Sequence, residues 1–241
     1  MITSTTNNTI KMLIKLKQKK YRDELGCYLI EGEHLVAEAL KAKQVECLIS
    51  TKSISSDLPI ILVSEEVMAK LAFTKSPQTI MAKCIINKNK DLIDGKRYLI
   101  LDDLQDPGNI GTLIRTALAF SIDQVILSSN CVDLYNDKLL RSMQGANFHI
   151  SCIYRDLNNV IPILKDKGVC IIGSALENGI DIKKIPVCRK MAYIVGNEGN
   201  GMNKETLVKC DQIGYIPINT IESLNVAVAG SIMMYHFNKN D

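Results

Sequence analysis

The hydrophobic positions of the first 86 residues alternate between helical and extended spacing. Apolar residues at helical intervals predict an amphipathic helix near the start, formed around Ile10, Leu13, Ile14 and Leu16. Short apolar runs predict strands, and amphipathic stretches between them predict helices. The predicted strands are YLIEG, VECLIS, PIILVS and IMAKCII, and the predicted helices are HLVAEALKAK and EEVMAKLAF, the second capped by Ser64. The pattern indicates a small α/β unit that ends near Ile86.

From residue 97 onward the apolar runs become nearly continuous and are separated by helical patterns. The predicted strands are YLILDDL, QVILSS, HISCIY, VCIIGSAL, AYIVGNEG and QIGYIPI. The predicted helices cover residues 109–120, 136–145, 158–167 and 203–210, and a last helix begins at Ser223. Strands that are apolar on both faces and alternate with helices form parallel sheets covered on both sides. We therefore expect an α/β domain built on a parallel sheet.

The polar segment NKNKDLIDGKR, residues 87–97, separates these two patterns and contains Gly95. Such a shift toward charged and flexible residues is typical of a linker. We expect a small α/β domain over residues 1–90 and the parallel-sheet domain over residues 91–241. The start, MITSTTNNTI, lacks the features of a signal peptide, and no stretch reaches the roughly 20 apolar residues of a membrane span. A cytoplasmic protein with no membrane partner is expected.

Composition narrows the class of protein only slightly. Hydrophobic residues make up 46% and charged residues 23% of the 241 positions, which excludes a disordered or fibrous chain. The formal net charge of +3 does not by itself indicate a nucleic-acid partner, but basic residues concentrate near the amino terminus. They are Lys11, Lys15, Lys17, Lys19, Lys20 and Arg22. A solvated helix face and an RNA contact explain this segment equally well.

Eight cysteines are spread along the chain. None of them has the C-x-x-C or Cys/His spacing of metal ligands, so no metal site is expected. The pattern favours buried thiols, which behave as small hydrophobic residues, in a reducing compartment.

Ligands of open α/β sheets bind beyond the carboxyl ends of the strands, so the turns after strands are the places to look for chemistry. In the first of three such turns, the helix NIGTLIRTALAF has one apolar face, and Gly111, Thr112 and Arg115 lie on the other side. Small residues one turn before Arg115 leave room for a bulky group beside its side chain. Taken alone, the segment is better explained as an amphipathic helix with a surface arginine.

The second turn, AYIVGNEGNGM, brings three glycines together around one acidic residue, Glu198. Glycine lets the backbone approach a ligand closely. The turn is not a phosphate-binding P-loop, because no Gly-Lys-Ser/Thr follows, and its glycine spacing is not that of a dinucleotide fingerprint. Taken alone, it is better explained as a plain tight turn.

The third turn leads into a helix that is apolar on nearly all sides, SLNVAVAGSIMM. Ser223 is suited to cap this helix, and Asn225 in its first turn could merely satisfy the helix start. A stripe of small residues permits close packing against another helix or another subunit. The stripe consists of Ser223, Ala227, Gly230 and Ser231.

In this order and separation, the three segments resemble the signature motifs of the SpoU (TrmH-like) family of RNA ribose 2'-O-methyltransferases. The first motif matches at Asn109, Gly111 and Arg115. The second matches at Gly196, Asn197, Glu198, Gly199 and Gly201, and the third at Ile216, Pro217, Ser223, Leu224 and Asn225. Three ordered motifs are far more specific than any one of them. The region up to Ile86 also resembles the separate substrate-binding domain of this family.

The resemblance implies a parallel-sheet catalytic domain with a trefoil knot, S-adenosylmethionine as the cofactor, and a homodimer. The cofactor-binding residues that it implies are Gly196, Asn197, Gly201, Ile216 and Leu224. The catalytic residues that it implies are Arg115, Asn109, Glu198, Ser223 and Asn225. Arg115 would handle the proton of the ribose hydroxyl while the others orient Arg115 and the ribose. Since arginine stays charged at ordinary pH, positioning of a phosphate or ribose is the safer role.

One departure from the family pattern lies in the turn NTI, residues 219–221, which is shorter than the usual turn and lacks its glycine. The implied reaction is methyl transfer to a ribose 2'-hydroxyl of RNA. The expected substrate is ribosomal RNA of the large subunit, and residues 1–90 are expected to supply the RNA affinity. Transfer RNA as the substrate, methylation of a base, and a non-catalytic RNA-binding role remain as alternatives. The intact set of Asn109, Arg115, Glu198 and Asn225 argues against the last of these.

Overall fold

The computed structural model describes residues 1–87, 91–221 and 223–238, and the chain forms two compact units. The first unit comprises Met1–Asn89 and Asp133–Phe148. The second comprises Lys90–Val132 and His149–Asp241. The sequence places the segment Asp133–Phe148 in the parallel-sheet domain, whereas in the structure it packs with the amino-terminal unit. Part of the expected linker, residues 88–90, lies outside the described residues.

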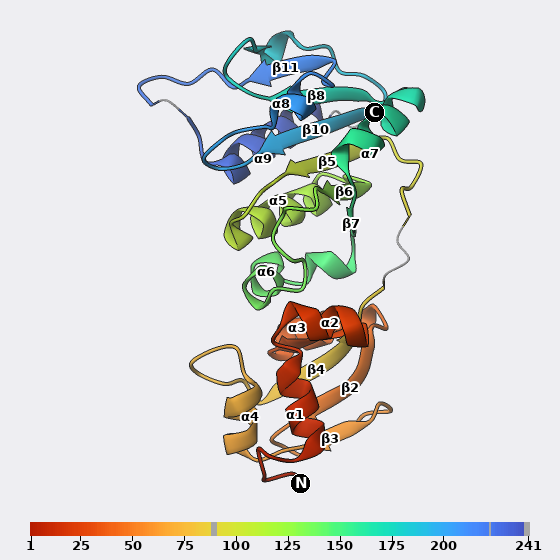
Figure 1. The fold of residues 1–241 in the computed structure, drawn as a ribbon, viewed down its shortest axis with the longest axis vertical. Coiled ribbons are helices and arrows are strands. Elements are labelled where there is room, and N and C mark those ends of the chain that lie inside the picture. The colour runs from red at the N-terminus through yellow and green to blue at the C-terminus, as the bar shows by residue number, and fades with distance from the viewer. Residues whose placement is uncertain (88–90, 222, 239–241) are drawn as a thin grey trace. The chain divides into compact units, whose positions relative to one another are not determined.

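A four-stranded sheet is the centre of the first unit (Figure 1). Its strands are β1 (Cys27–Glu31), β2 (Val45–Ser50), β3 (Ile60–Leu62) and β4 (Ile80–Ile85), in the order β1-β4-β2-β3. Strand β4 runs antiparallel to β1 and β2, and β3 runs parallel to β2. The helices are α1 (Asn8–Lys15), α2 (Lys19–Leu25), α3 (Glu33–Lys41), α4 (Glu65–Leu71), α6 (Asp137–Met143) and the short 3-10 helix η1 (Ala146–Phe148). The predicted strands of this part are confirmed, and α2 is an addition.

Helices α1 and α4 cover one face of this sheet. The buried cluster that joins them to the strands contains Ile10, Leu13 and Leu16 from the first helical segment, Val67, Met68 and Leu71 from α4, and Leu29, Ile49 and Met81 from the sheet. The hydroxyl of Ser64 accepts a hydrogen bond from the backbone N–H of Val67, so the predicted cap of α4 is confirmed. The segment Asp133–Phe148 joins the unit through contacts that include the rings of Tyr28 and Tyr135, whose centroids are 4.5 Å apart.

Two of the basic residues near the amino terminus, Lys17 and Arg22, form hydrogen bonds or ion pairs within the first unit. Arg22 forms a buried ion pair with Asp133. The ammonium of Lys17 donates hydrogen bonds to the backbone carbonyls of Lys70 at 2.9 Å and Ala72 at 2.7 Å, and partial burial lowers its pKa. These bonds satisfy carbonyls at the end of α4. Neither explanation offered for this segment is needed at Lys17, because its ammonium is hydrogen-bonded to two backbone carbonyls of the same unit.

Seven parallel strands form the sheet of the second unit, in the order β7-β6-β5-β10-β8-β11-β9. They are β5 (Arg97–Asp102), β6 (Gln124–Leu127), β7 (Ser151–Tyr154), β8 (Cys170–Ser174), β9 (Ile180–Asp181), β10 (Met191–Gly196) and β11 (Gln212–Tyr215). The helices are α5 (Pro107–Ala119), α7 (Leu157–Asp166), α8 (Lys204–Leu207), α9 (Val226–Phe237) and the 3-10 helix η2 (Ile182–Lys184). The predicted parallel sheet is confirmed, and the short strand β9 is an addition.

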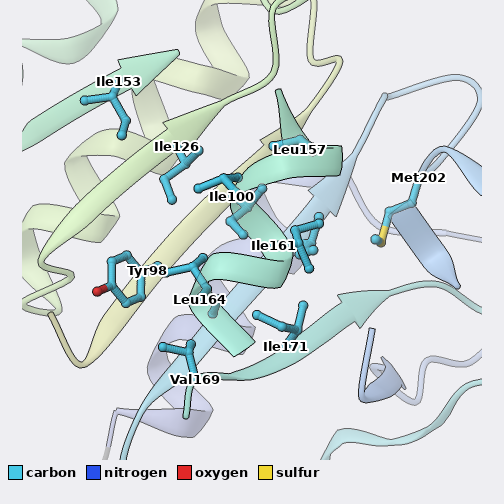
Figure 2. Close-up of a cluster of buried hydrophobic side chains, with 13 residues drawn as sticks. Tyr98, Ile100, Ile126, Ile153, Leu157, Ile161, Leu164, Val169, Ile171 and Met202 are labelled. Atoms are coloured by element: carbon cyan, nitrogen blue, oxygen red, sulfur yellow. The ribbon is translucent and has the colours of Figure 1, made fainter. Parts of the chain in front are cut away.

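Residues of the central strands alternate between the two faces of this sheet. On one face, Ile100 of β5 packs with Ile161 and Leu164 of α7 in the cluster that Figure 2 shows. On the other face, Tyr193 of β10 stacks on Phe237 of α9 with ring centroids 5.5 Å apart. Helices thus bury both faces, which explains why the strands are apolar at nearly every position.

The strand order fixes where a ligand would bind. The chain moves from β5 outward through β6 to β7, while β10 lies on the opposite side of β5. Ligands of open α/β sheets bind beyond the carboxyl ends of the strands at such a reversal. Strands β5, β10, β8 and β11 are successive parallel neighbours, so the loops that follow them meet at one edge of the sheet. All three sequence motifs lie in or next to these loops.

Within the described ranges, no helix combines the length and the apolar character needed to cross a membrane. The same part of the chain contains no group of three or more His, Cys, Asp or Glu side chains able to hold a metal ion. The eight cysteines are free thiols, and five of them are buried. Those five act as small hydrophobic residues of the core.

Candidate active site

A cavity of about 950 Å³ lies at the carboxyl edge of the seven-stranded sheet. Loops after β8, β10 and β11 line it together with residues from the starts of α5 and α9. The predicted site residues that line it are Asn109, Gly196, Asn197, Glu198, Gly201, Ile216, Ser223, Leu224 and Asn225. Arg115 is the predicted site residue that does not. The structure therefore brings the three motifs to one cavity, although Asn109 and Asn225 are 116 positions apart.

A chain of hydrogen bonds joins one polar side chain from each motif. The Asn109 amide donates to a Glu198 carboxylate oxygen at 3.2 Å, and the Asn225 amide donates to the Asn109 side-chain oxygen at 2.9 Å. Glu198 also accepts from the backbone N–H groups of Gln105 at 3.3 Å and Asp106 at 3.2 Å. Partial burial acts to raise the pKa of Glu198, but its hydrogen bonds outweigh burial and hold the pKa below its ordinary value. Glu198 is therefore an anion that orients Asn109, and it is a poor proton acceptor.

Glycines allow the loop after β10 to fold back on itself. Asn197 and Gly201 exchange two backbone hydrogen bonds of 2.9 Å, which close the loop. A Cβ atom on Gly196 would lie 2.2 Å from the backbone nitrogen of Met202 and 2.3 Å from the carbonyl carbon of Gly201. Gly201 itself has a φ of +70°, which favours glycine. The loop conformation therefore requires glycine at both positions.

Two acidic residues that the sequence analysis missed hold this loop against β5. Asp102 is buried and accepts hydrogen bonds from the Asn203 backbone N–H at 2.8 Å and the Asn203 amide at 2.7 Å. Asp103 accepts one from the Ser128 hydroxyl at 2.5 Å, and its backbone carbonyl accepts one from the Asn197 amide at 2.9 Å. Asp103 has a φ of +60°, a conformation that side chains rarely adopt. Two acids directly after an apolar strand, in YLILDD, were the available signal.

Asn225 is the residue that begins the last helix. Its side-chain oxygen accepts hydrogen bonds from the backbone N–H groups of Ala227 at 2.9 Å and Val228 at 3.3 Å. The prediction that Ser223 is the N-cap is wrong, because α9 starts directly after Asn225. Asn225 thus uses its oxygen to cap the helix and its amide nitrogen to bind Asn109. This double use fixes the orientation of both side chains.

The turn at residues 219–221, which departs from the family pattern, contains one residue in a strained backbone conformation. Thr220 has a φ of +75°, in the left-handed region that glycine adopts freely and β-branched residues rarely adopt. The turn that lacks the family's glycine thus holds a threonine in a strained conformation, two residues after Ile218 of the cavity lining.

Arg115 lies on the exposed side of α5, while Ile114 and Ala117 of the same helix are buried. About 9 Å of helix axis separates Arg115 from Asn109. Among the described residues, its guanidinium takes part in no hydrogen bond or ion pair. Its charge is therefore available to a substrate, at a position outside the lining of the cavity.

Two known protein families match this chain, each over a different part of the sequence. The model of the SpoU rRNA Methylase family matches residues 96–235, which is more than half of the chain. The chain belongs to the SpoU rRNA methylase family. The MRM3-like substrate binding domain matches residues 7–82. The two matches cover both the seven-stranded sheet and most of the amino-terminal unit.

Individual relatives resemble the chain over nearly its whole length. The 23S rRNA (guanosine(2553)-2'-O)-methyltransferase RlmP of Bacillus subtilis (strain 168) is 42% identical over 98% of this chain and 98% of its own. The uncharacterized tRNA/rRNA methyltransferase slr1673 of Synechocystis is 30% identical over 97% of this chain and 92% of its own. The AdoMet-bound rRNA methyltransferase from Sinorhizobium meliloti superposes with a TM-score of 0.88, at 27% identity over 98% of this chain and 96% of its own.

The cavity fits a ligand of the kind that the Sinorhizobium enzyme holds. Its volume of about 950 Å³ lies within the range of roughly 300–1,000 Å³ that is usual for cofactor sites. Gly196, Ile216 and Leu224 line it, and Met202 and Met233 supply apolar surface. Close packing at Gly196 keeps side-chain bulk out of this part of the loop. These residues could therefore hold S-adenosylmethionine.

Proposed function

We propose that this chain transfers a methyl group from S-adenosylmethionine to the ribose 2'-hydroxyl of a guanosine in 23S ribosomal RNA. The observation that supports this most directly is the hydrogen-bonded chain Glu198–Asn109–Asn225 beside the cavity. The name of the relative RlmP supplies the position, guanosine 2553 of 23S rRNA. The likeness to RlmP extends over both units, so we propose the equivalent nucleotide as the target.

S-Adenosylmethionine supplies an electrophilic methyl group when it is bound. The chain must then orient a ribose hydroxyl toward that group, so that the oxygen–methyl bond forms as the methyl–sulfur bond breaks and the hydroxyl proton passes to solvent water. Asn109 and Asn225 are held in fixed orientations by Glu198 and the start of α9, which suits them to position the ribose. Arg115 is charged and has a planar fork of donors, which suits it to hold ribose and phosphate oxygens. We therefore assign positioning, not general-base catalysis, to Arg115.

Methyl transfer to an unmodified 23S rRNA transcript tests this function. The purified full chain with S-adenosylmethionine is expected to yield 2'-O-methylguanosine when the product RNA is digested to nucleosides and analysed by mass spectrometry. A methylated base would support the base-methyltransferase alternative. Preferential methylation of tRNA would show that transfer RNA, and not ribosomal RNA, is the substrate. RNA binding without any methyl transfer would support the non-catalytic alternative.

We also propose that the chain forms a homodimer through α5 and α9. A shallow apolar depression lies on the outer side of these helices, lined by Thr112, Phe120, Ala227, Val228, Ser231, Ile232 and Tyr235. Val228 is 47% exposed and Tyr235 is 71% exposed. Continuous apolar surface of this kind typically marks an interaction site, and the small residues Ala227 and Ser231 permit close approach.

At micromolar concentration, the full chain is expected to sediment as a dimer. Tyr235→Asp should shift it to the monomer, because a charge in a dry interface is left unpaired. Leu25→Asp is the matched control, since Leu25 is an exposed apolar residue of α2, outside the depression. A wild-type chain that sediments as a monomer would contradict the proposed interface.

We further propose that the two domains predicted from the sequence have separate roles. We assign RNA affinity to residues 1–90 and methyl transfer to residues 91–241. The match of residues 7–82 to the MRM3-like substrate binding domain supports the first assignment. The knotted topology remains a prediction from the family resemblance, and the cytoplasmic location remains a prediction from the sequence.

A further inference from the structure

A buried carboxylate in the first unit holds one surface loop in a defined conformation. Glu31, at the end of β1, is 6% exposed. Its oxygens accept hydrogen bonds from the backbone N–H groups of Phe73 at 2.8 Å, Thr74 at 3.2 Å and Gln78 at 3.1 Å. The Thr74 hydroxyl donates to the same carboxylate at 2.6 Å. Residues 73–78, here called the Glu31 loop, are therefore tied at both ends to one side chain.

A second charged side chain supports the start of the Glu31 loop. Lys17 donates to the carbonyls of Lys70 and Ala72, directly before the loop, and its ammonium lies 5.4 Å from the centre of the Phe73 ring. Burial of charged groups is costly unless each is hydrogen-bonded. Two charged side chains of the amino-terminal unit, Glu31 and Lys17, thus stabilise the conformation of one short loop.

The outer side of the Glu31 loop is polar. Lys75, Ser76, Pro77 and Gln78 are exposed. Among the described residues, the side chains of Lys75 and Gln78 take part in no hydrogen bond or ion pair. No large hydrophobic side chain of the described loop residues is exposed, whereas protein-binding surfaces use apolar or aromatic anchors. The loop therefore presents hydrogen-bonding groups and one unpaired positive charge on a rigid support.

We propose that the Glu31 loop is a contact surface for unpaired RNA, in which Lys75 binds a phosphate and Gln78 binds the edge of a base. The inference rests on the proposed function, because it takes RNA to be the substrate. Single-stranded RNA is recognised through hydrogen bonds to base edges that pairing would otherwise hide. A loop that is already fixed by Glu31 loses less conformational entropy when it binds. Lys70, exposed at the end of α4, adds positive charge beside the loop.

The double variant Lys75→Gln/Gln78→Ala removes both contacts and leaves Glu31 with its backbone hydrogen bonds. Its dissociation constant for a 23S rRNA fragment around the target, measured by fluorescence anisotropy, is expected to rise roughly tenfold or more. The slope of log affinity against log salt should become shallower by about 0.7, the loss of one phosphate contact on a single strand. The affinity for S-adenosylmethionine should match that of the wild type.

Lys43→Gln is the matched control. Lys43 is an exposed lysine beyond the carboxyl end of α3, and Gly32, which precedes that helix, lies beside Gln78 of the Glu31 loop. The substitution changes net charge by the same amount as Lys75→Gln, and RNA affinity is expected to stay at the wild-type value. A second variant, Glu31→Gln, keeps every exposed side chain and should weaken RNA binding by releasing the loop. Where that variant does not fold, the surface variant decides alone.

Wild-type RNA affinity and salt slope in Lys75→Gln/Gln78→Ala would overturn this inference. An equal loss of affinity in Lys43→Gln would also overturn it, because general electrostatic attraction would then explain the effect. A wild-type chain that methylates no RNA would instead overturn the proposed function. The two failures are therefore distinguishable in the same set of measurements.

Discussion

Lysine in place of Arg115 is expected to slow methyl transfer by at least about a hundredfold. Lysine keeps the positive charge but lacks the planar guanidinium that can hold two oxygens at once. Arg115 is exposed on α5 and takes part in no hydrogen bond or ion pair within the described residues, so its replacement removes little packing. The loss should appear in the chemical step, measured in single turnovers at saturating RNA and S-adenosylmethionine.

Two further variants help to interpret this result, one that removes the side chain and one that serves as a control. Arg115→Ala should abolish methyl transfer while the unfolding temperature and the affinity for S-adenosylmethionine stay near wild type. Arg189→Lys is the matched control, because Arg189 is exposed and precedes β10 at the end opposite the cavity loops. A near wild-type rate in Arg115→Lys would show that positive charge alone suffices, and the positioning role of the guanidinium would then be wrong.

Alanine at Gly196 is expected to weaken the binding of S-adenosylmethionine by about a hundredfold, because backbone of the cavity loop must move. The added Cβ would lie 2.2 Å from the backbone nitrogen of Met202, and no ordinary Cβ contact is that short. The neighbouring atoms belong to the backbone, so a rotamer change cannot relieve the clash. Isothermal titration calorimetry of the full chain measures the affinity.

Gly199→Ala is the control for this substitution. Gly199 lies in the same loop, its φ is outside the left-handed region, and its added Cβ would come no closer than 3.6 Å to the Asn197 side chain. It should bind S-adenosylmethionine nearly as the wild type does. If Gly196→Ala, with an unfolding temperature close to that of Gly199→Ala, also binds at wild-type affinity, the cavity described here does not hold the cofactor.

The sequence predicted the strands well because each combines an apolar run with flanking turn residues. Helix α2 escaped prediction because its sequence, KKYRDEL, is short and mostly charged. The start of α9 was placed two residues early, since Ser223 and Asn225 are both good caps and only the hydrogen bonds distinguish them. The structural role of Lys17 could not be predicted, because its partners, the carbonyls of Lys70 and Ala72, lie more than 50 positions away.

The site was predictable as a set of motifs but not as a geometry. Neither periodicity nor spacing could show that Asn225 binds Asn109, because 116 residues separate them. In the sequence, Asp102 and Asp103 are only the polar end of a predicted strand. They hold the loop after β10 because β5 and β10 are neighbours in the sheet. Pairing of strands that are distant in sequence is a tertiary property, which local patterns do not encode.

The most direct test of the account is a map of ribose methylation in 23S rRNA from cells with and without the gene for this chain. Deletion is expected to remove one 2'-O-methyl mark, at the nucleotide equivalent to guanosine 2553, and the wild-type gene should restore it. The gene with Arg115→Ala should not restore it. An unchanged ribose map, or the loss of a base methylation instead, would contradict the assignment of this chain as a ribose 2'-O-methyltransferase of 23S rRNA.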